Sequence, residues 1–266
     1  MDDNREYIEA NRRSWGLIAA EHYQAFKARL EAQETTLSRT QIEELGNLRG
    51  KRLVHVQCNT GADSISLRRM GAIVTGTDIV PENIHYARKL AQDFGMEDMC
   101  FLEANTLELM EVLDEKYDVV YTTEGVLCWL PDLKLWARNM RHLLREDGFL
   151  YLMDSHPFFM VWDEDKLPEL AVKYPYFQKN ADPDDWIGGY ASPGVPAVNY
   201  SWMYTLGEIV TALSEAGLHI EWLHEFDWLF FKLASEKHVQ DAQRNWVFPE
   251  HQEKLPYTFS LKATVR

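Results

Sequence analysis

The sequence predicts a doubly wound α/β fold, with helices on both faces of a mostly parallel sheet. Short apolar runs rich in branched residues alternate with segments of helical spacing between residues 52 and 153, which is typical of consecutive βαβ units. Polar residues follow these runs, as expected where buried parallel strands end. The chain of 266 residues, 46% of them hydrophobic, allows one large domain of this class or two small ones.

Five buried strands and four connecting helices are predicted in this region. The strands are expected at residues 52–56, 73–77, 99–102, 117–122 and 149–153. The helices are expected at residues 64–70, 81–94, 107–113 and 131–144. Asp63 and Ser64 are suited to cap the first of these helices, Pro81 to begin the second, and Asp147-Gly148 to turn the chain after the last.

Residues 1–50 are predicted to form a helical segment ahead of the sheet. Apolar side chains recur at helical spacing over residues 4–29, with Gly16 as a candidate break point. Ser38 and Gln41 can form a capping box for a second, short helix. The long helix either packs against the sheet domain or serves as a lid that closes over a pocket, and the sequence alone leaves both interpretations open.

The regular alternation stops after the fifth strand. Prolines and aromatic residues crowd the next segment, which is too apolar for a disordered linker. We expect an ordered insertion over the strand ends at about residues 157–205, and a helix at residues 206–216. Residues 219–224 and 257–263 alternate as half-exposed strands that can pair in antiparallel fashion at the edge of the sheet. The sheet domain therefore comprises residues 51–266, with seven strands.

The first βαβ unit carries the pattern of a nucleoside-binding site. A tight turn, Gln57-Cys58-Asn59-Thr60-Gly61, follows the first strand, and Asp78 ends the second strand about 20 residues later. An adenosine ligand needs this geometry, because backbone amides and a helix N-terminus lie under one end while the carboxylate accepts from the ribose hydroxyls. The pattern G-x-G-x-x-G is absent, since Gln57 and Asn59 replace its first glycines. The plainer alternative is a turn glycine at Gly61 and a surface acid at Asp78.

Composition argues against several other classes of protein. The formal net charge of −15 and the lack of a basic run argue against RNA or DNA as a partner. The polar N-terminus and the lack of a long apolar run predict a cytoplasmic protein without a signal peptide or a membrane span. The three cysteines, Cys58, Cys100 and Cys128, lack metal-like spacing and fit free thiols in a reducing compartment.

Four segments together resemble a known enzyme family. They are residues 55–64 (His-Val-Gln-Cys-Asn-Thr-Gly-Ala-Asp-Ser), residues 71–78, residues 127–132 (Leu-Cys-Trp-Leu-Pro-Asp) and His156-Pro157. The first is similar to the turn H-x-Q-C-(H/N)-x-G-x-D-(S/T) of a bacterial subgroup of small-molecule methyltransferases. With these segments the chain resembles the class I S-adenosylmethionine (SAM)-dependent methyltransferases. The resemblance implies the Rossmann-like methyltransferase fold, with seven strands of which the last is antiparallel. It also implies SAM as cofactor, with S-adenosylhomocysteine (SAH) as its product. In a transferase of this kind we expect residues 1–50 to serve as an N-terminal helical lid and the insertion between strands 5 and 6 to form the acceptor site.

The resemblance also implies which residues hold the cofactor. These are Gln57, Cys58, Asn59, Gly61 and Thr123 at the methionine part, Asp78 at the ribose hydroxyls, and Ile79, Asn105 and Thr106 at the adenine. Beyond the resemblance, Trp15 and His22 are candidates to close the cofactor pocket from the N-terminal helix. His55 stands where the family usually has an acid, which removes an anchor for the amino group of SAM. The side chains of Gln57 and Asn59 are candidates to supply hydrogen bonds instead.

The implied reaction is an in-line methyl transfer from SAM to a small acceptor, in which the enzyme aligns the reacting atoms and excludes water. His156, at the tip of the fifth strand, is the first candidate for a general base, and its alternative is a histidine satisfied in a turn. Glu124 is a second candidate, for orienting the acceptor or favouring the sulfonium. The many aromatic residues predict a partly aromatic or apolar acceptor. The absence of metal-ligand spacing predicts metal independence.

Two other functions stay open. An NAD-dependent oxidoreductase would use Asp78 equally well, although the missing second glycine and the antiparallel strand pair argue against it. A SAM-binding module without transferase activity would carry the same first turn. The expected partner of a transferase is a small-molecule acceptor, and the chain is expected to act as a monomer or a homodimer.

Overall fold

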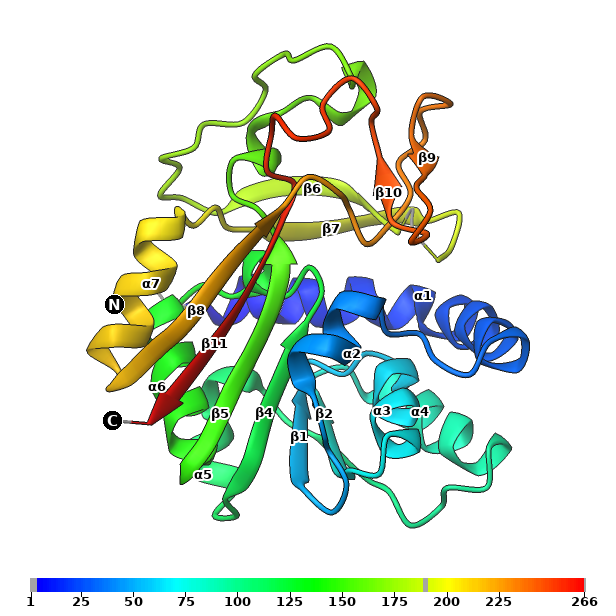
Figure 1. The fold of residues 1–266 in the computed structure, drawn as a ribbon, viewed down its shortest axis with the longest axis vertical. Coiled ribbons are helices and arrows are strands. Elements are labelled where there is room, and N and C mark those ends of the chain that lie inside the picture. Colours follow the sequence, from blue (N-terminus) through cyan, green and yellow to red (C-terminus); the bar gives the residue numbers. More distant parts are fainter. Residues whose placement is uncertain (1–3, 189–190, 266) are drawn as a thin grey trace.

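A single seven-stranded sheet forms the centre of the protein, in the order β3-β2-β1-β4-β5-β11-β8 (Figure 1). The structure, a computed structural model, describes residues 4–188 and 191–265. The strands of the sheet are β1 (Arg52–Val56), β2 (Ile73–Asp78), β3 (Cys100–Glu103), β4 (Tyr117–Thr123), β5 (Leu144–Ser155), β8 (Leu218–Phe226) and β11 (Thr258–Val265). The first five pair in parallel, whereas β11 is antiparallel to both β5 and β8. The predicted fold class is confirmed.

Helices cover both faces of this sheet. They are α1 (Arg5–Ala32), α2 (Arg39–Leu45), α3 (Ala62–Arg69), α4 (Pro81–Asp93), α5 (Leu109–Val112), α6 (Leu133–Leu143) and α7 (Leu206–Glu215). In β1, Leu53 packs into the apolar cluster shared with α1 to α4, and its neighbour Val54 packs into the cluster shared with α5 to α7. Successive side chains of a strand point to opposite faces, so each buried strand supplies both halves of the core.

The first turn differs from the prediction in how its helix begins. Gly61 is the N-terminal cap of α3 and has a left-handed backbone, with φ of 80°. Neither Asp63 nor Ser64 caps the helix. The Asp63 carboxylate accepts hydrogen bonds from the Tyr121 and Thr36 hydroxyls instead, and the Ser64 hydroxyl bonds to a ring nitrogen of His55. The two residues that the sequence favours as caps therefore bind other elements.

Two glycines lie inside regular elements rather than at the breaks predicted from them. Helix α1 runs through Gly16 without interruption, with the flexible side chain of Glu82 on α4 as its nearest neighbour. Likewise, β5 begins before Gly148 rather than after it, and a Cβ at Gly148 would lie 2.9 Å from the carbonyl oxygen of Tyr117 on β4. The predictions of a helix break and of a turn at these positions are wrong, and at Gly148 the glycine lets two strands approach. The predicted capping box of α2, between Ser38 and Gln41, is present.

Two segments form a cap over the carboxyl ends of the parallel strands (Figure 1). The first is the predicted insertion, whose residues 189 and 190 lie outside the described part of the chain, as do residues 1–3 of the polar N-terminus. The second, residues 227–256, was not predicted. The two segments contain the short 3₁₀ helices η3 (Phe159–Val161) and η4 (Glu164–Lys166) and the strands β6 (Asp182–Ile187), β7 (Val195–Ser201), β9 (Val239–Gln240) and β10 (Trp246–Val247). A small apolar core joins the two segments, made of Phe159, Leu167, Leu229, Leu233, Phe248 and Tyr257.

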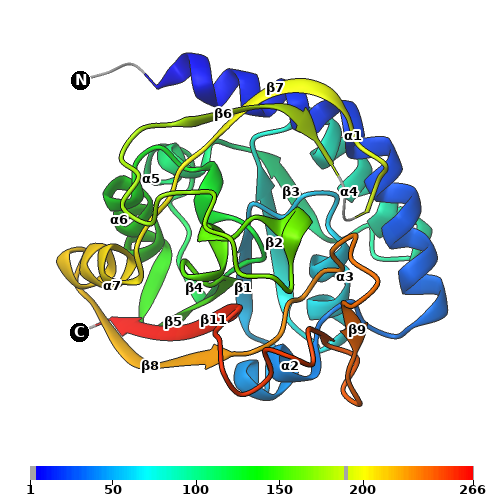
Figure 2. The ribbon, with the colours of Figure 1, turned by 90° about the horizontal axis from the view of Figure 1, so that it is seen from above.

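Helix α1 lies alongside strand β7 of the cap, as the view from above shows (Figure 2). The hairpin β6–β7 and the N-terminal helix thus pack against each other. Among the described residues, no helix has both the length and the apolar character needed to cross a membrane.

Candidate functional site

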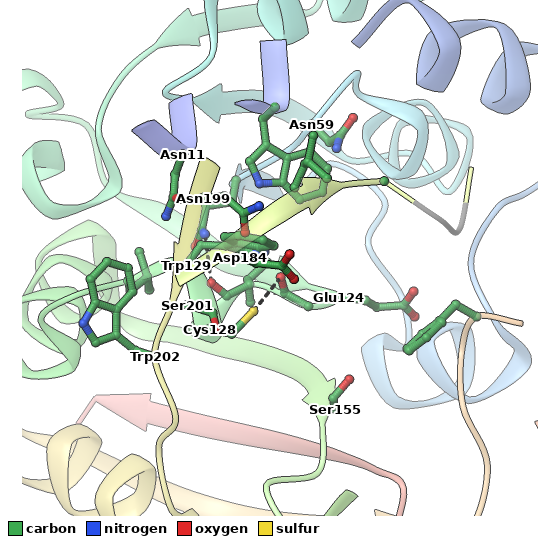
Figure 3. A pocket seen from close by; sticks show the side chains of 18 of the residues that line it. Asn11, Asn59, Glu124, Cys128, Trp129, Ser155, Asp184, Asn199, Ser201 and Trp202 are labelled. Atoms are coloured by element: carbon green, nitrogen blue, oxygen red, sulfur yellow. Dashed lines mark hydrogen bonds between the residues drawn. The ribbon is translucent and has the colours of Figure 1, made fainter. Parts of the chain in front are cut away.

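A large cavity lies between the carboxyl ends of the strands and the cap (Figure 3). Its volume is about 1200 Å³. This exceeds the roughly 300–1,000 Å³ of a usual single-ligand pocket, so two small molecules can occupy it together. Residues from the strand tips, from α1 and from both cap segments line it. The cavity therefore lies where ligands of doubly wound sheets bind.

Most of the residues predicted for the site meet at this cavity. Those that line it are Trp15, Gln57, Cys58, Asn59, Asp78, Ile79, Asn105, Thr106, Thr123 and Glu124. His22, Gly61 and His156 are not part of the lining. A group of residues far apart in the sequence is thus brought together at one place.

The carboxylate of Asp78 is held rigidly at the end of β2. Its Oδ2 accepts the backbone N–H of Asn59 at 2.8 Å, and its Oδ1 accepts the backbone N–H of Val80 at 2.9 Å and the amide of Asn83 at 3.2 Å. Burial raises the pKa of Asp78, and these three donors act in the opposite direction. A carboxylate offers about four acceptor positions, so Oδ2 keeps one for a ligand in the cavity.

The first turn presents a hydrogen-bond acceptor to which no described residue donates. Gln57 and Asn59 both have left-handed backbones, with φ of 58° and 49°. The Gln57 amide donates to the carbonyl of Val126 at 3.1 Å, while its Oε1 is buried and has no partner among the described residues. The Asn59 Oδ1 already accepts the backbone N–H of Thr60 at 2.6 Å. Of the two side chains predicted to bind the cofactor, Gln57 has an acceptor oxygen without a partner in the described part of the chain, whereas the Asn59 oxygen already accepts one hydrogen bond.

Gly61 is required by packing behind the turn. A Cβ at this residue would lie 3.0 Å from the Cβ of Ala87 on α4 and 3.2 Å from the ring of Phe101 on β3. The glycine thus keeps the turn close to its neighbours, and its backbone conformation also favours glycine.

The N-terminal helix reaches the cavity through Trp15. Its ring contacts that of Trp129 edge to face, with 5.2 Å between centroids. His22 lies deeper, fully buried, with Nδ1 at 3.4 Å from the Asn59 amide nitrogen. Burial lowers the pKa of His22 to about 4, so this imidazole is neutral at physiological pH. His22 therefore supports the first turn, while Trp15 forms part of the cavity wall.

Two carboxylates lie at the cavity floor beside the tip of β4. Glu124 directly follows β4, and Asp63 accepts a hydrogen bond from the Tyr121 hydroxyl at 3.0 Å. Burial raises the pKa of Glu124 well above its usual range, and the negative charges of Asp63 and Asp154 add to this effect, while Arg29 opposes it. Asp63 was not predicted as a site residue, although its place in the first-turn motif was a signal.

His156 does not face the cavity. Its Nε2 lies 2.9 Å from a carboxylate oxygen of Glu225 on β8, and its Nδ1 accepts the backbone N–H of Phe158 at 3.0 Å. Burial lowers the pKa of His156, and Glu225 opposes this. Since both ring nitrogens are occupied, the geometry does not support His156 as the base. It agrees with the alternative of a histidine satisfied in a turn.

Asp154, the last acid of β5, positions the loop that carries Glu124. Its carboxylate accepts the backbone N–H groups of Gly125, Val126 and Leu127 at 2.9 to 3.0 Å. Three charge-assisted bonds hold the loop in one conformation. Asp154 is therefore a positioning residue.

Several cap residues that line the cavity were not predicted from the sequence. They are Asp182, Asp184, Asn199, Ser201, Phe230 and Phe231. Within the described ranges, no group of three or more His, Cys, Asp or Glu side chains is arranged to hold a metal ion.

Comparison with known proteins gives consistent matches. Residues 54–152 match the family model described as "Methyltransferase domain". The ubiquinone biosynthesis O-methyltransferase of Glaesserella parasuis is 28% identical over 114 residues, which cover 41% of this chain and 48% of that protein. The chain thus spans about half the length of the curated relatives it matches.

Solved structures show the same fold. A SAM-dependent methyltransferase from Mesorhizobium loti superposes with a TM-score of 0.58 at 21% identity, over 83% of this chain and 94% of that one. The magnesium protoporphyrin IX methyltransferase of Synechocystis PCC 6803, with bound SAH, gives a TM-score of 0.53 at 17% identity, over 93% and 84% of the two chains. The fold is therefore the Rossmann-like methyltransferase fold.

Proposed function

We propose that this protein is a SAM-dependent methyltransferase that acts on a small molecule. The observation that carries the proposal is the Asp78 carboxylate, fixed by three donors and open to the cavity on one side. It belongs to the segment that matches a methyltransferase domain. The match to O-methyltransferases and the SAH-bound structure of the same fold support the same reaction class.

The residues present fit SAM. The open position on Asp78 suits a ribose hydroxyl, and the buried, unpartnered Oε1 of Gln57 suits a donor such as the SAM ammonium group. Ile79 and Asn105 line the same cavity, where the resemblance expects the adenine. When bound, SAM supplies an electrophilic methyl group on a sulfonium.

The chain's own contribution is alignment, charge and exclusion of water. The carboxylate of Asp63, and that of Glu124 once it is ionised, favour cationic groups at the cavity floor, and the cap and Trp15 cover the cavity. Glu124, whose pKa is raised, is the titratable group best suited to take a proton from the acceptor. The acceptor occupies the part of the cavity under the cap. The cytoplasmic location and the oligomeric state, monomer or homodimer, stay predictions.

Titration calorimetry tests this function. We expect SAH and SAM to bind in a one-to-one ratio, and NAD to show no binding at the same concentrations. Asp78→Asn should weaken SAH binding at least tenfold, because it places an amide against the Asn59 N–H and removes the charge that faces the ribose. Glu103→Gln is the matched control. Glu103 lies opposite Asp78 in the register of β2 and β3, but its side chain is exposed and outside the lining. Binding of NAD in preference to SAH would overturn the proposal.

A further inference from the structure

One face of the hairpin β6–β7 presents hydrogen-bond acceptors to the cavity. The register pairs Asp182 with Ser201 and Asp184 with Asn199 across the two strands. Residues directly opposite each other in an antiparallel pair point to the same face, as do residues two apart. All four line the cavity, and Figure 3 shows the side chains of Asp184, Asn199 and Ser201 there.

The side-chain amide of Asn199 is held in one orientation on this face. It is only 3% exposed, and its Nδ2 donates to the carbonyl oxygens of Trp186 at 2.9 Å and Ala197 at 3.1 Å. Both amide hydrogens are therefore used, which also fixes the orientation of the amide, because a flipped oxygen would face two carbonyls. Its Oδ1 accepts no hydrogen bond from the residues that the structure describes, so it remains an acceptor for a ligand at the cavity wall.

The charges of the upper cavity are unbalanced. The acids of the cap that line it are Glu164, Asp165, Asp182 and Asp184. None of them is within ion-pair distance of a lysine or arginine in the described part of the chain. Among the basic residues of the lining, Arg12 pairs with Glu9 and Lys173 with Asp163, while Arg29 donates to the Thr36 carbonyl and Lys232 lies over the Trp246 ring. In its described residues, the hairpin contributes two carboxylates and no basic side chain to the lining, so the charge that this wall presents to the cavity is negative.

Aromatic side chains surround the same space. Trp129, Trp186 and Trp202 line the cavity together with Phe230 and Phe231 of the second cap segment. An organic cation gains from contact with such rings as well as from carboxylates. The chain's net charge of −15 adds a long-range attraction for cations.

We propose that the acceptor molecule carries a protonated amine, bound by the carboxylates of Asp182 and Asp184 and by the amide oxygen of Asn199. This inference rests on the proposed methyl transfer, because it assigns the wall of the cavity that faces the acceptor. An ammonium group donates up to three hydrogen bonds, and the two carboxylates and the Asn199 Oδ1 of this wall only accept them. A carboxylate-bearing molecule would be repelled by the same groups.

The test is calorimetry with matched probes on two skeletons. The protein saturated with SAH is titrated with phenethylamine, 2-phenylethanol and phenylacetate, and with tryptamine, tryptophol and indole-3-acetate. We expect each amine to bind at least tenfold tighter than its alcohol, and each carboxylate to bind weakest. The variant Asp182→Asn/Asp184→Asn should weaken amine binding about 30-fold or more and leave alcohol binding within twofold.

Asp185→Asn is the matched control. Asp185 follows Asp184 on the same hairpin, is exposed, and lies outside the lining, so the variant should bind amines as the parent does. The inference is overturned if neither amine binds, if amines and carboxylates bind equally, or if the double variant binds amines as the control does. Failure of the methyltransferase proposal is seen separately, as the absence of SAH binding before any amine is added. In that event the same titrations on the free protein still measure the preference for cations.

Discussion

The side chain of Asn11 on α1 bonds to both backbone polar groups of Tyr200 on β7. Its Nδ2 donates to the Tyr200 carbonyl at 2.8 Å, and the Tyr200 N–H donates to its Oδ1 at 2.7 Å. Ser14, one turn further along the helix, donates to the carbonyl of Val198 at 2.7 Å. These side chains take the place of a neighbouring strand and satisfy the edge of β7. The N-terminal helix and the hairpin therefore cover the cavity as one connected unit.

Replacement of Asn11 should loosen this connection. Asn11→Leu removes two hydrogen bonds and leaves the Tyr200 backbone unpaired beside the helix, so we expect the free energy of unfolding to fall by about 1–3 kcal/mol. Hydrogen exchange should show faster exchange of the Tyr200 amide. Arg13→Leu, at an exposed position of the same helix, should change stability by no more than about 0.5 kcal/mol. Unchanged exchange at Tyr200 in Asn11→Leu would contradict the connection.

A pair of glycine variants separates backbone strain from packing. Gly61→Ala and Gly95→Ala both place a side chain at a positive φ, of 80° and 67°. At Gly95 nothing lies within 4 Å of the new Cβ, so strain alone should cost about 1 kcal/mol. At Gly61 the contacts with Ala87 and Phe101 add a clash, and the total cost should reach about 2–4 kcal/mol. Equal losses in chemical denaturation would show that the packing behind the first turn does not matter.

The buried carboxyl group of Glu124 should make the free energy of unfolding depend on pH. Its pKa in the folded protein is raised above the usual 4.5, so over a window above that value the folded state holds a proton that the unfolded state has lost. Stability without ligand should therefore fall as pH rises through this window. Glu124→Gln removes the effect and should be more stable than the parent at pH 8 by about 1 kcal/mol, with little difference at pH 4. Urea unfolding at both pH values measures this, with Glu111→Gln at an exposed site as the control. A parent protein that gains stability from pH 5 to 8 relative to Glu124→Gln would contradict the assignment.

His156→Ala should affect stability more than chemistry. It removes the contacts with Glu225 and with the Phe158 backbone, so we expect a loss of about 1–3 kcal/mol in the free energy of unfolding. Single-turnover methyl transfer by the folded, SAM-saturated variant should stay within about fivefold of the parent rate, because general-base catalysis is usually worth 10²–10⁴-fold. A hundredfold slower turnover with unchanged stability would instead identify His156 as the base.

Local patterns in the sequence were enough to predict the sheet. Strand β1 has the predicted bounds, and Asp78 ends β2 as expected, because branched apolar runs and polar strand tips are local signals. The first turn follows from the same signals, whereas the place of Asp63 in the site does not.

Long-range contacts could not be predicted in this way. Asn11 and Tyr200 are 189 residues apart, and nothing in either local pattern indicates their pairing. His156 was located correctly at the end of β5, but its partner Glu225 is 69 residues away. Gly16 is typical of a helix break, yet α1 continues through it, and its nearest neighbour is the Glu82 side chain of another helix.

A crystal structure of the protein with SAH would show whether Asp78 holds the ribose of SAM at the carboxyl ends of the strands. We expect ribose hydroxyls within hydrogen-bond distance of the Asp78 Oδ2, about 2.5–3.0 Å, with the adenine against Ile79. An SAH ribose bound elsewhere in the cavity, with Asp78 contacting only Asn59, Val80 and Asn83, would rule out this role of Asp78.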